Sequence, residues 1–246
     1  MSDNKEAFNQ LAHKYSTIQD HNWGDMSKFA HRNVILDSGI SRVLDVGNGG
    51  APPQELLLPE QVRKLKLFVG MDLSHSMLRR NEYDSRVVGD GFDPPFKKGS
   101  FDTVMVWECL HHLGLTGSPD SLKVLKRFVL RVGEMVAPDG YIYIIEPTFP
   151  AWLEWLERVV FRLLFLLKKG EGTTKAYIFS TGMVSKIMAE QFDCEYLERV
   201  PMHRILGGRL KPYIPMIFLS WFKIPVGLIP AGVLYCRARP RSRENG

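Results

Sequence analysis

The chain has 246 residues but only three cysteines, and it contains no internal repeat or low-complexity segment. Cys109, Cys194 and Cys236 lie far apart and are odd in number, which argues against a disulfide framework and gives no metal-ligand spacing. We therefore expect a reducing compartment and no metal site. Residues 1–15 are polar and lack the apolar core of a cleaved export signal, so we expect a cytoplasmic protein.

The charge balance is basic without being extreme. The formal net charge is +5 and the isoelectric point about 9.1, while 45% of the residues are hydrophobic and 24% are charged. These proportions are typical of a globular protein with a sizeable core. Some basic side chains gather near the end of the sequence, at Arg237, Arg239, Arg241 and Arg243. Such a cluster attracts anionic lipid or nucleic acid weakly.

Apolar runs of strand length alternate with helical patterns along most of the chain. The expected strands cover residues 42–46, 65–72, 86–89, 103–107, 141–146, 195–201 and 232–239. The expected helices cover residues 1–20, 25–38, 53–63, 75–81, 119–136 and 183–192, and the Ala-Pro-Asp-Gly of residues 137–140 is a stop-and-turn signal. This alternation predicts an α/β fold with a mostly parallel, seven-stranded sheet that helices cover on both faces.

The most informative segment is Val-Leu-Asp-Val-Gly-Asn-Gly-Gly at residues 43–50. An apolar strand carries Asp45 near its end and runs into a turn that contains Gly47, Asn48 and Gly49. Glycine lets the backbone approach a ligand closely, because it has no Cβ and tolerates positive φ. At a first strand-to-helix crossover, such a turn predicts a site for a nucleotide-like ligand.

Two further features narrow the kind of ligand. Asp72 ends the next strand, where an acid can accept hydrogen bonds from ribose hydroxyls. A dinucleotide fits less well, because Pro52 stands where that fingerprint needs its third glycine, and Asp45 would repel a pyrophosphate. Asp45 suits a cationic amino acid end instead, so we expect a nucleoside joined to an amino acid. Pro52, Pro53 and Pro59 predict that the helix after the turn is short or bent.

Four motifs in order carry a resemblance to a known family. They are VLDVGNGG at residues 43–50, GMDLSHSML at 70–78, GDGFDPPFKKGSFDTVMVWECLHH at 89–112 and APDGYIYIIEP at 137–147. On these motifs the chain resembles the class I S-adenosylmethionine-dependent methyltransferases, in the large group that acts on small molecules. The resemblance implies the Rossmann-like fold of that class and S-adenosylmethionine as the cofactor.

The resemblance also implies a cofactor site. Asp45 would border the methionine part, Asp72 would hold the ribose, and Asp90 would take the adenine amino group. Trp107 would flank the sulfonium, and Tyr15 on the first helix would close over the cofactor. The full set of implied cofactor-binding residues is Asp45, Gly47, Asn48, Gly49, Asp72, Leu73, Met77, Asp90, Gly91 and Trp107.

Three residues after the fourth of these strands are candidates for catalysis. Methyl transfer from a sulfonium needs a general base only when the acceptor is a hydroxyl or an acidic carbon. His111 and His112 are candidates because histidine titrates near neutrality, and Glu108 sits at a strand end facing the same cleft. Each of the three could instead pack, cap a turn or hold the substrate.

Two apolar stretches follow the core. In residues 150–169, Glu154, Arg158 and Arg162 form one narrow polar stripe, whereas a surface helix normally needs a wider polar face. This helix is therefore buried, lines an apolar pocket or touches lipid. Residues 212–235 are long enough for a membrane span, but three prolines and the expected last strand favour a re-entrant or interfacial element. With the basic tail, these stretches predict peripheral contact with the inner face of a membrane.

We therefore expect methyl transfer to a small, amphipathic or lipid-linked acceptor, with oxygen or carbon favoured over nitrogen as the acceptor atom. The alternative is a cofactor-binding partner subunit without catalysis. Nucleic acid is not expected, because no basic stripe interleaved with aromatic residues is present. One domain is expected, with a helical cap at 1–40, a cofactor-binding core at 41–147, an apolar helical insertion after the fifth strand at 148–182 and a C-terminal part at 183–246.

Overall fold

A computed structural model describes residues 5–6, 8–10, 12, 23–35, 39–79, 85–113, 119–156, 158–159, 177–205 and 230–241. The strands are β1 (Arg42–Val46), β2 (Leu67–Asp72), β3 (Arg86–Val88), β4 (Phe101–Trp107), β5 (Val136–Thr148), β6 (Phe192–Pro201) and β7 (Gly232–Pro240). The helices are α2 (Trp23–Asn33), α3 (Pro53–Leu56), α4 (Pro59–Val62), α5 (His75–Leu78), the 3₁₀ turn η1 (Leu110–His112), α6 (Pro119–Gly133), α8 (Thr181–Gln191) and α9 (Met202–Ile205). Residues 5–6, 8–10, 12, 151–156 and 158–159 are also helical.

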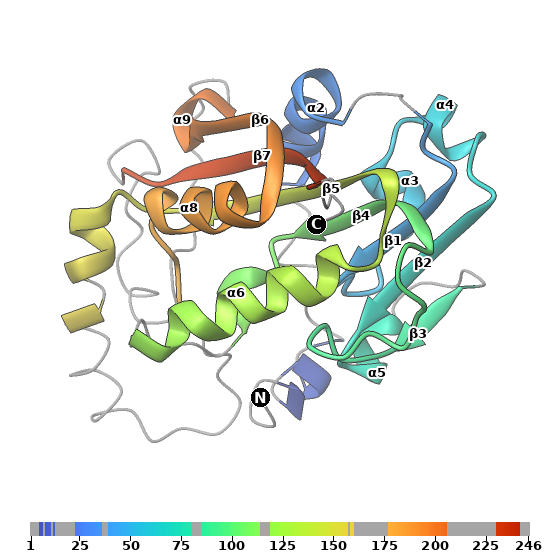
Figure 1. Cartoon of the computed structure of the whole chain (residues 1–246), viewed down its shortest axis with the longest axis horizontal. Coiled ribbons are helices and arrows are strands. Elements are labelled where there is room, and N and C mark those ends of the chain that lie inside the picture. The colour runs from blue at the N-terminus through green and yellow to red at the C-terminus, as the bar shows by residue number, and fades with distance from the viewer. Residues whose placement is uncertain are drawn as a thin grey trace, which may run out of the picture.

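The strands form one seven-stranded sheet in the order β3-β2-β1-β4-β5-β7-β6 (Figure 1). The pairs from β3 across to β5 are parallel, and β7 runs antiparallel to both β5 and β6. The predicted α/β class and mostly parallel sheet are confirmed. In this order the carboxyl ends of β1, β2 and β4 lie at the same edge of the sheet. The strand order reverses between β1 and β4. Open α/β sheets bind their ligands at such a reversal point.

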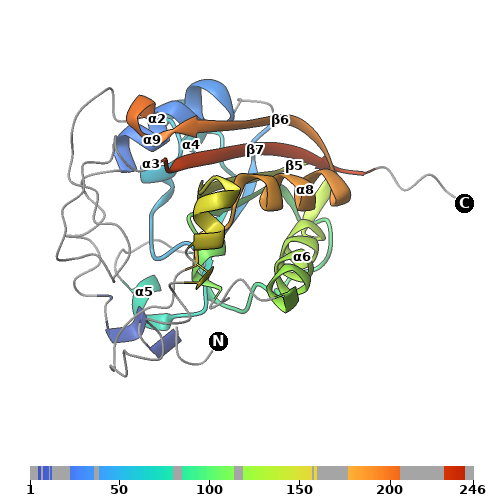
Figure 2. The same ribbon diagram turned by 90° about the vertical axis from the view of Figure 1, so that its left-hand side faces the viewer.

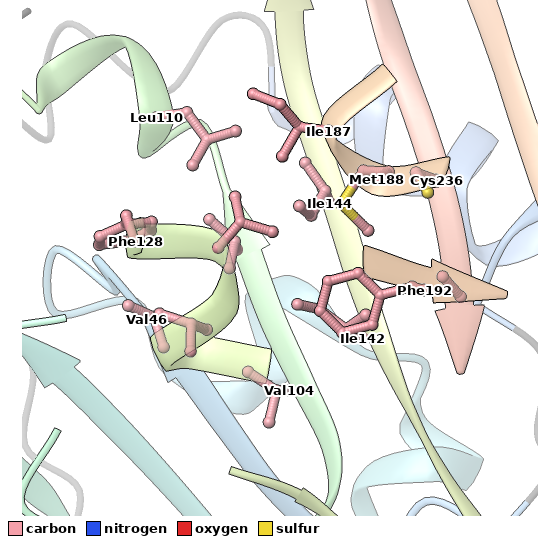
Figure 3. Packing of buried hydrophobic residues seen from close by; sticks show 14 of the residues in the cluster. Val46, Val104, Leu110, Phe128, Ile142, Ile144, Ile187, Met188, Phe192 and Cys236 are labelled. Atoms are coloured by element: carbon pink, nitrogen blue, oxygen red, sulfur yellow. The ribbon is translucent and has the colours of Figure 1, made fainter. Parts of the chain in front are cut away.

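The sheet buries both of its faces. Side chains alternate along each strand, so Val104 and Val106 of β4 join one core cluster while Met105 and Trp107 join the other. Helices α6 and α8 cover the first face, and α2, α3 and α9 cover the second (Figure 2). Figure 3 shows the first cluster, in which strand side chains meet Phe128 of α6 and the α8 side chains Ile187 and Met188.

Three predicted boundaries are wrong for identifiable reasons. The helix expected at 53–63 is split into α3 and α4, because Pro59 cannot continue the ladder of the first piece and starts a second one; the bend expected from the prolines is confirmed. Helix α6 ends at Gly133 rather than 136. The turn signal at 137–140 lies inside β5, where the register jumps from Phe101↔Val136 to Thr103↔Tyr141 and accommodates it as a bulge.

The apolar stretches are only partly described. Residues 151–156 and 158–159 of the helix expected at 150–169 are helical, and the rest of it lies outside the described residues. Most of the stretch at 212–235 lies outside them too, except for residues 230–235, where β7 begins. Within the described part of the chain, no helix reaches the length and apolarity that a membrane crossing requires.

Candidate functional site

The glycine-rich turn after β1 has the backbone that its sequence predicts. Gly47, Gly49 and Gly50 have φ of 74°, 60° and 81°, in the left-handed region that disfavours side chains. Their loop is tied to the end of β2, because the Gly47 and Asn48 N–H groups donate to the Met71 carbonyl at 2.8 and 3.1 Å. A Cβ on Gly47 would overlap Sγ of Cys109 and lie 2.8 Å from its Cβ. The turn after β1 therefore packs directly against the Cys109 side chain of the segment after β4, and no side chain fits at Gly47.

Asp45 lies beneath this turn, and only one of its two carboxylate oxygens accepts a hydrogen bond from a described residue. The Asn48 amide donates to Asp45 Oδ2 at 2.7 Å and to the Ala51 carbonyl at 2.8 Å, while its own oxygen accepts from the Gly50 N–H. Asp45 Oδ1 is buried and has no hydrogen-bond partner among the described residues. Burial raises the pKa of Asp45 to about 7, against the Asn48 hydrogen bond, which lowers it. A cationic group would supply the missing partner.

Asp72 holds the neighbouring strand end in place. Its Oδ2 accepts from the Gly49 N–H at 2.9 Å and its Oδ1 from the Ser74 N–H at 2.8 Å. Burial raises the pKa of Asp72, and these backbone bonds oppose that shift. The Ser74 hydroxyl caps α5 by accepting from the Met77 N–H at 3.2 Å, and it donates to Asn9 Oδ1 at 2.6 Å. The N-terminal helical residues are thereby fastened to this edge of the sheet.

The segment after β3 closes the far side of the site. Asp90 Oδ1 accepts from the Phe92 N–H at 2.9 Å, which turns the chain back. A Cβ on Gly91 would overlap the ring of Phe128 from α6, and one on Gly89 would lie 2.8 Å from the Met71 sulfur. The absence of side chains at these two positions leaves the backbone free to form a wall.

Glu108, directly after β4, is held in a strained backbone. Its φ is 46°, the only positive value at a non-glycine residue among those described, and such a conformation costs of order 1–3 kcal/mol. Its N–H donates to the Ile145 carbonyl at 2.8 Å. Its carboxylate makes no hydrogen bond or ion pair with another described residue. Burial, and then the nearby Glu146, raise the pKa of Glu108 to about 8.

Glu146 of β5 anchors the turn that follows Glu108. Its Oε2 accepts from the N–H groups of Cys109 and Leu110, both at 3.1 Å, and its Oε1 accepts from the His111 N–H at 2.9 Å. The His111 Nδ1 lies 2.6 Å from the same Oε1. Glu146 is fully buried, which raises its pKa to about 8 although the three backbone bonds lower it. The Glu146 carboxylate thus takes every free N–H of the first turn after β4.

The two histidines differ in what they face. Burial lowers the pKa of His111 to about 4, and burial, with the nearby His111, lowers the pKa of His112 well below its usual range. Their rings lie with centroids 3.9 Å apart and tilted by 45°, and the Phe8 ring meets His112 edge-on at 4.9 Å. His112 lines the cavity described next, whereas His111 turns toward Glu146. Both imidazoles are neutral at physiological pH.

A cavity at this sheet edge brings most of the predicted residues together. All ten residues expected around the cofactor line it, together with Glu108 and His112; His111 does not. Sequence reasoning did not assign Lys5, Phe8, Glu55, Cys109, Leu113 or Phe128, which also line it. The position of Cys109 directly after Glu108 could have indicated it, while Phe128 comes from a helix whose pattern shows only core packing. Tyr15 lies outside the described residues.

The comparisons with known proteins give one family match. Residues 44–144 match the family model described as a methyltransferase domain. The sequence matches none of the curated proteins with which it was compared.

Three solved structures illustrate the likeness in fold. A chain from the complex between the Haloferax volcanii Trm112 methyltransferase activator and a methyltransferase has a TM-score of 0.65 at 15% identity, covering 99% of this chain and 100% of that one. Burkholderia thailandensis 1,6-didemethyltoxoflavin-N1-methyltransferase has a TM-score of 0.56 at 15% identity, and the match covers 97% of this chain and 87% of that one. Geranyl diphosphate C-methyltransferase from Streptomyces coelicolor A3(2) has a TM-score of 0.57 at 11% identity, and the match covers 89% of this chain and 77% of that one. At such identities the likeness establishes the class I fold, and residues 44–144 carry the match to the domain family.

Proposed function

We propose that the chain, whose residues 44–144 match a methyltransferase domain and whose fold is that of the class I methyltransferases, transfers a methyl group from S-adenosylmethionine to a small, amphipathic or lipid-linked acceptor. The observation that carries the proposal is the open oxygen of Asp45. A buried carboxylate that lacks half of its partners, beside a turn without side chains, suits a ligand with a cationic amino acid end. The same pocket offers no cluster of basic side chains for a pyrophosphate, since Lys5 is its only lining cation among the described residues.

The residues present fit the methyl donor. Asp45 and the backbone around Gly47 and Gly49 would hold its amino acid end, Asp72 its ribose, and the wall from Asp90 to Gly91 its base. When bound, S-adenosylmethionine supplies a methyl group that is already activated for direct displacement. The protein then has to align the acceptor and exclude water, which the apolar side chains of Trp107 and Phe8 at the cavity support.

We assign the proton-handling role, where the acceptor needs one, to Glu108. Glu108 lines the cavity, and its raised pKa of about 8 makes its carboxylate a stronger base than that of an ordinary glutamate. His112 is the second candidate, with a pKa lowered by burial. His111 is a positioning residue in this proposal, because its ring nitrogen is engaged by Glu146. An oxygen or carbon acceptor fits this assignment better than an amine.

The amphipathic acceptor is supported by the apolar surface beyond the core. Trp152 and Trp155 are 60% and 62% exposed on the helix that follows β5. The basic tail supports it less than the sequence suggested. Arg237 and Arg239 pair with Glu195 at 3.1 and 2.6 Å, and Arg241 pairs with Asp193 at 3.5 Å. We propose a cytoplasmic enzyme that works at the inner face of a membrane, with the helix rather than the tail as the contact.

A cofactor-binding partner subunit without catalysis remains the second candidate. The Haloferax relative comes from a complex with a Trm112 methyltransferase activator, so a protein with this fold can work in partnership. The cavity favours catalysis, because a non-catalytic subunit has no need of a strained, cavity-facing Glu108.

The test separates donor binding from turnover. Calorimetric titration with S-adenosylhomocysteine should give saturable binding to the wild type and weaker binding to Asp45→Asn. Labelled S-adenosylmethionine is then incubated with lipid, quinone, sugar and polyketide-like acceptors. Label in one acceptor class supports the enzyme. Binding without label in any class, alone or with an activator subunit, favours the partner subunit, and a flat titration contradicts both.

A further inference from the structure

The helix after β5 exposes large apolar side chains and buries an acidic one, the reverse of an ordinary surface helix. Its large apolar side chains point outward: Trp152, Trp155, Leu156 and Val159 are 60%, 62%, 42% and 51% exposed. Glu154, in contrast, points inward and is only 3% exposed. This is the yellow helix at the left edge of the molecule in Figure 1. Single exposed apolar residues are common, but four within two turns form a patch that marks an interaction site.

The inward acid fixes this orientation. Glu154 Oε1 accepts from the Tyr177 hydroxyl at 2.7 Å, and its Oε2 accepts from the Ser180 N–H at 3.0 Å. Arg158, one turn on, donates to Glu154 Oε1 at 3.3 Å. A buried carboxylate with these partners cannot turn to solvent without losing them. The apolar side chains on the opposite face therefore stay outward.

The same anchor joins the helix to the candidate active site. Tyr177, whose hydroxyl binds Glu154, donates its backbone N–H to the His111 carbonyl at 2.9 Å. His111 belongs to the turn that Glu146 holds and that carries Glu108 and His112 to the cavity. Two hydrogen bonds, from the Tyr177 hydroxyl to Glu154 and from the Tyr177 N–H to His111, thus connect the helix that carries the apolar patch to the turn beside which the acceptor would react.

The geometry points to the surface of an anionic lipid bilayer as what covers the outward face of residues 151–159. This inference rests on the proposed function, in which the acceptor is amphipathic or lipid-linked. Tryptophan is enriched at the membrane–water interface. Residues 160–169, which follow in the sequence, read Val-Phe-Arg-Leu-Leu-Phe-Leu-Leu-Lys-Lys and contain three basic residues and no acid. An exposed apolar face followed in sequence by a basic, apolar segment complements an anionic, interfacial surface.

The test compares vesicle binding by the full chain and two matched double variants. Vesicles of phosphatidylglycerol and phosphatidylcholine in equal parts, and of phosphatidylcholine alone, are sedimented with the protein. The wild type should bind the anionic vesicles and release them in about 1 M salt, where the screening length is about 3 Å. Trp152→Ala/Trp155→Ala should weaken this binding roughly tenfold or more, because two indoles lose their burial in the interface. Leu130→Ala/Leu197→Ala removes side chains that are 49% and 41% exposed elsewhere and should bind like the wild type.

Three results overturn the inference. The first is a wild type that does not bind anionic vesicles, and the second is a tryptophan variant that binds them as well as the wild type. The third is a wild-type dimer that the tryptophan substitutions convert to a monomer, because a second copy of the chain would then cover this face. Calorimetric titration with S-adenosylhomocysteine is run on all three proteins. Unchanged binding in each shows that they are folded, and its absence in the wild type contradicts the proposed function separately from the docking surface.

Discussion

The Glu146 carboxylate and the His111 ring meet at the turn after β4, with Nδ1 and Oε1 2.6 Å apart. The same carboxylate accepts from three successive backbone N–H groups, of Cys109, Leu110 and His111. A side chain on β5 therefore determines where the turn after β4 runs. That turn begins with Glu108 in a left-handed conformation, so the contact also supports the strain at the residue proposed to face the acceptor.

Glu146→Gln should destabilise the protein by about 2–4 kcal/mol. The amide keeps one acceptor oxygen, but its NH₂ would face backbone donors, and each buried N–H left without a partner costs about 1–3 kcal/mol. Chemical denaturation with a two-state fit measures the loss. Glu190→Gln, which removes only surface pairings with Lys126 and Lys186, should change the free energy of unfolding by less than about 1 kcal/mol. Equal effects in the two variants would show that Glu146 does not anchor the turn.

Glu108→Gln tests the proposed base. With a raised pKa of about 8, the ionised fraction of Glu108 grows as pH rises through 8. The methylation rate on an acceptor that must lose a proton should therefore rise about tenfold per pH unit below 8 and level off above it. The substitution should lower the plateau rate on the order of 10²-fold and remove this dependence. A variant with the wild-type profile would assign the dependence to another group, with His112→Ala as the next candidate to test.

The sequence was most informative where backbone chemistry decides the structure. Gly47 and Gly49 need positive φ, and Asp45 and Asp72 follow apolar strands, so their meeting at one sheet edge could be predicted from parallel topology alone. The anchoring by Glu146 could not, because it depends on the register between β4 and β5, which brings residues 35–37 positions apart within hydrogen-bond distance.

The helix after β5 shows a different limit of sequence reasoning. Its narrow polar stripe of Glu154, Arg158 and Arg162 was open to burial, an apolar pocket or lipid contact. The structure turns Glu154 toward Tyr177 and Ser180, and Arg158 donates to Glu154. The described part of the stripe therefore faces the protein, while the apolar side chains face out. Periodicity indicates which residues share a face but not which face packs inward. The bulge at 137–140 was missed for a similar reason, since a turn signal does not say whether the ladder resumes across it.

Gly47→Ala should be far more costly than the same change at Gly39. Both have strongly positive φ, 74° and 76°, and that conformation alone costs an alanine roughly 1 kcal/mol. A Cβ on Gly39 would meet nothing within 4 Å, whereas one on Gly47 would overlap Cys109. Thermal unfolding should therefore show a small loss for Gly39→Ala. Gly47→Ala should show a loss of at least about 2 kcal/mol together with weakened binding of S-adenosylhomocysteine. Similar losses in both would mean that Gly47 does not pack against Cys109 as described.

The pH dependence of cofactor binding provides a test of Asp45 itself. Burial raises its pKa to about 7 in the free protein, whereas a bound ammonium group would favour the carboxylate and lower it. Binding below pH 7 must then expel a proton, so the affinity for S-adenosylhomocysteine should fall by up to tenfold per pH unit as pH drops from 7 to 5, and stay level just above 7. Asp45→Asn should bind weakly and lose this dependence. Asp102→Asn removes an acid of β4 that pairs with Arg42 and does not line the cavity, so it should keep the wild-type curve. Calorimetry in two buffers of different ionisation enthalpy counts the expelled protons directly. If the wild type releases none at pH 6, Asp45 is either ionised before the ligand arrives or does not meet its cationic end.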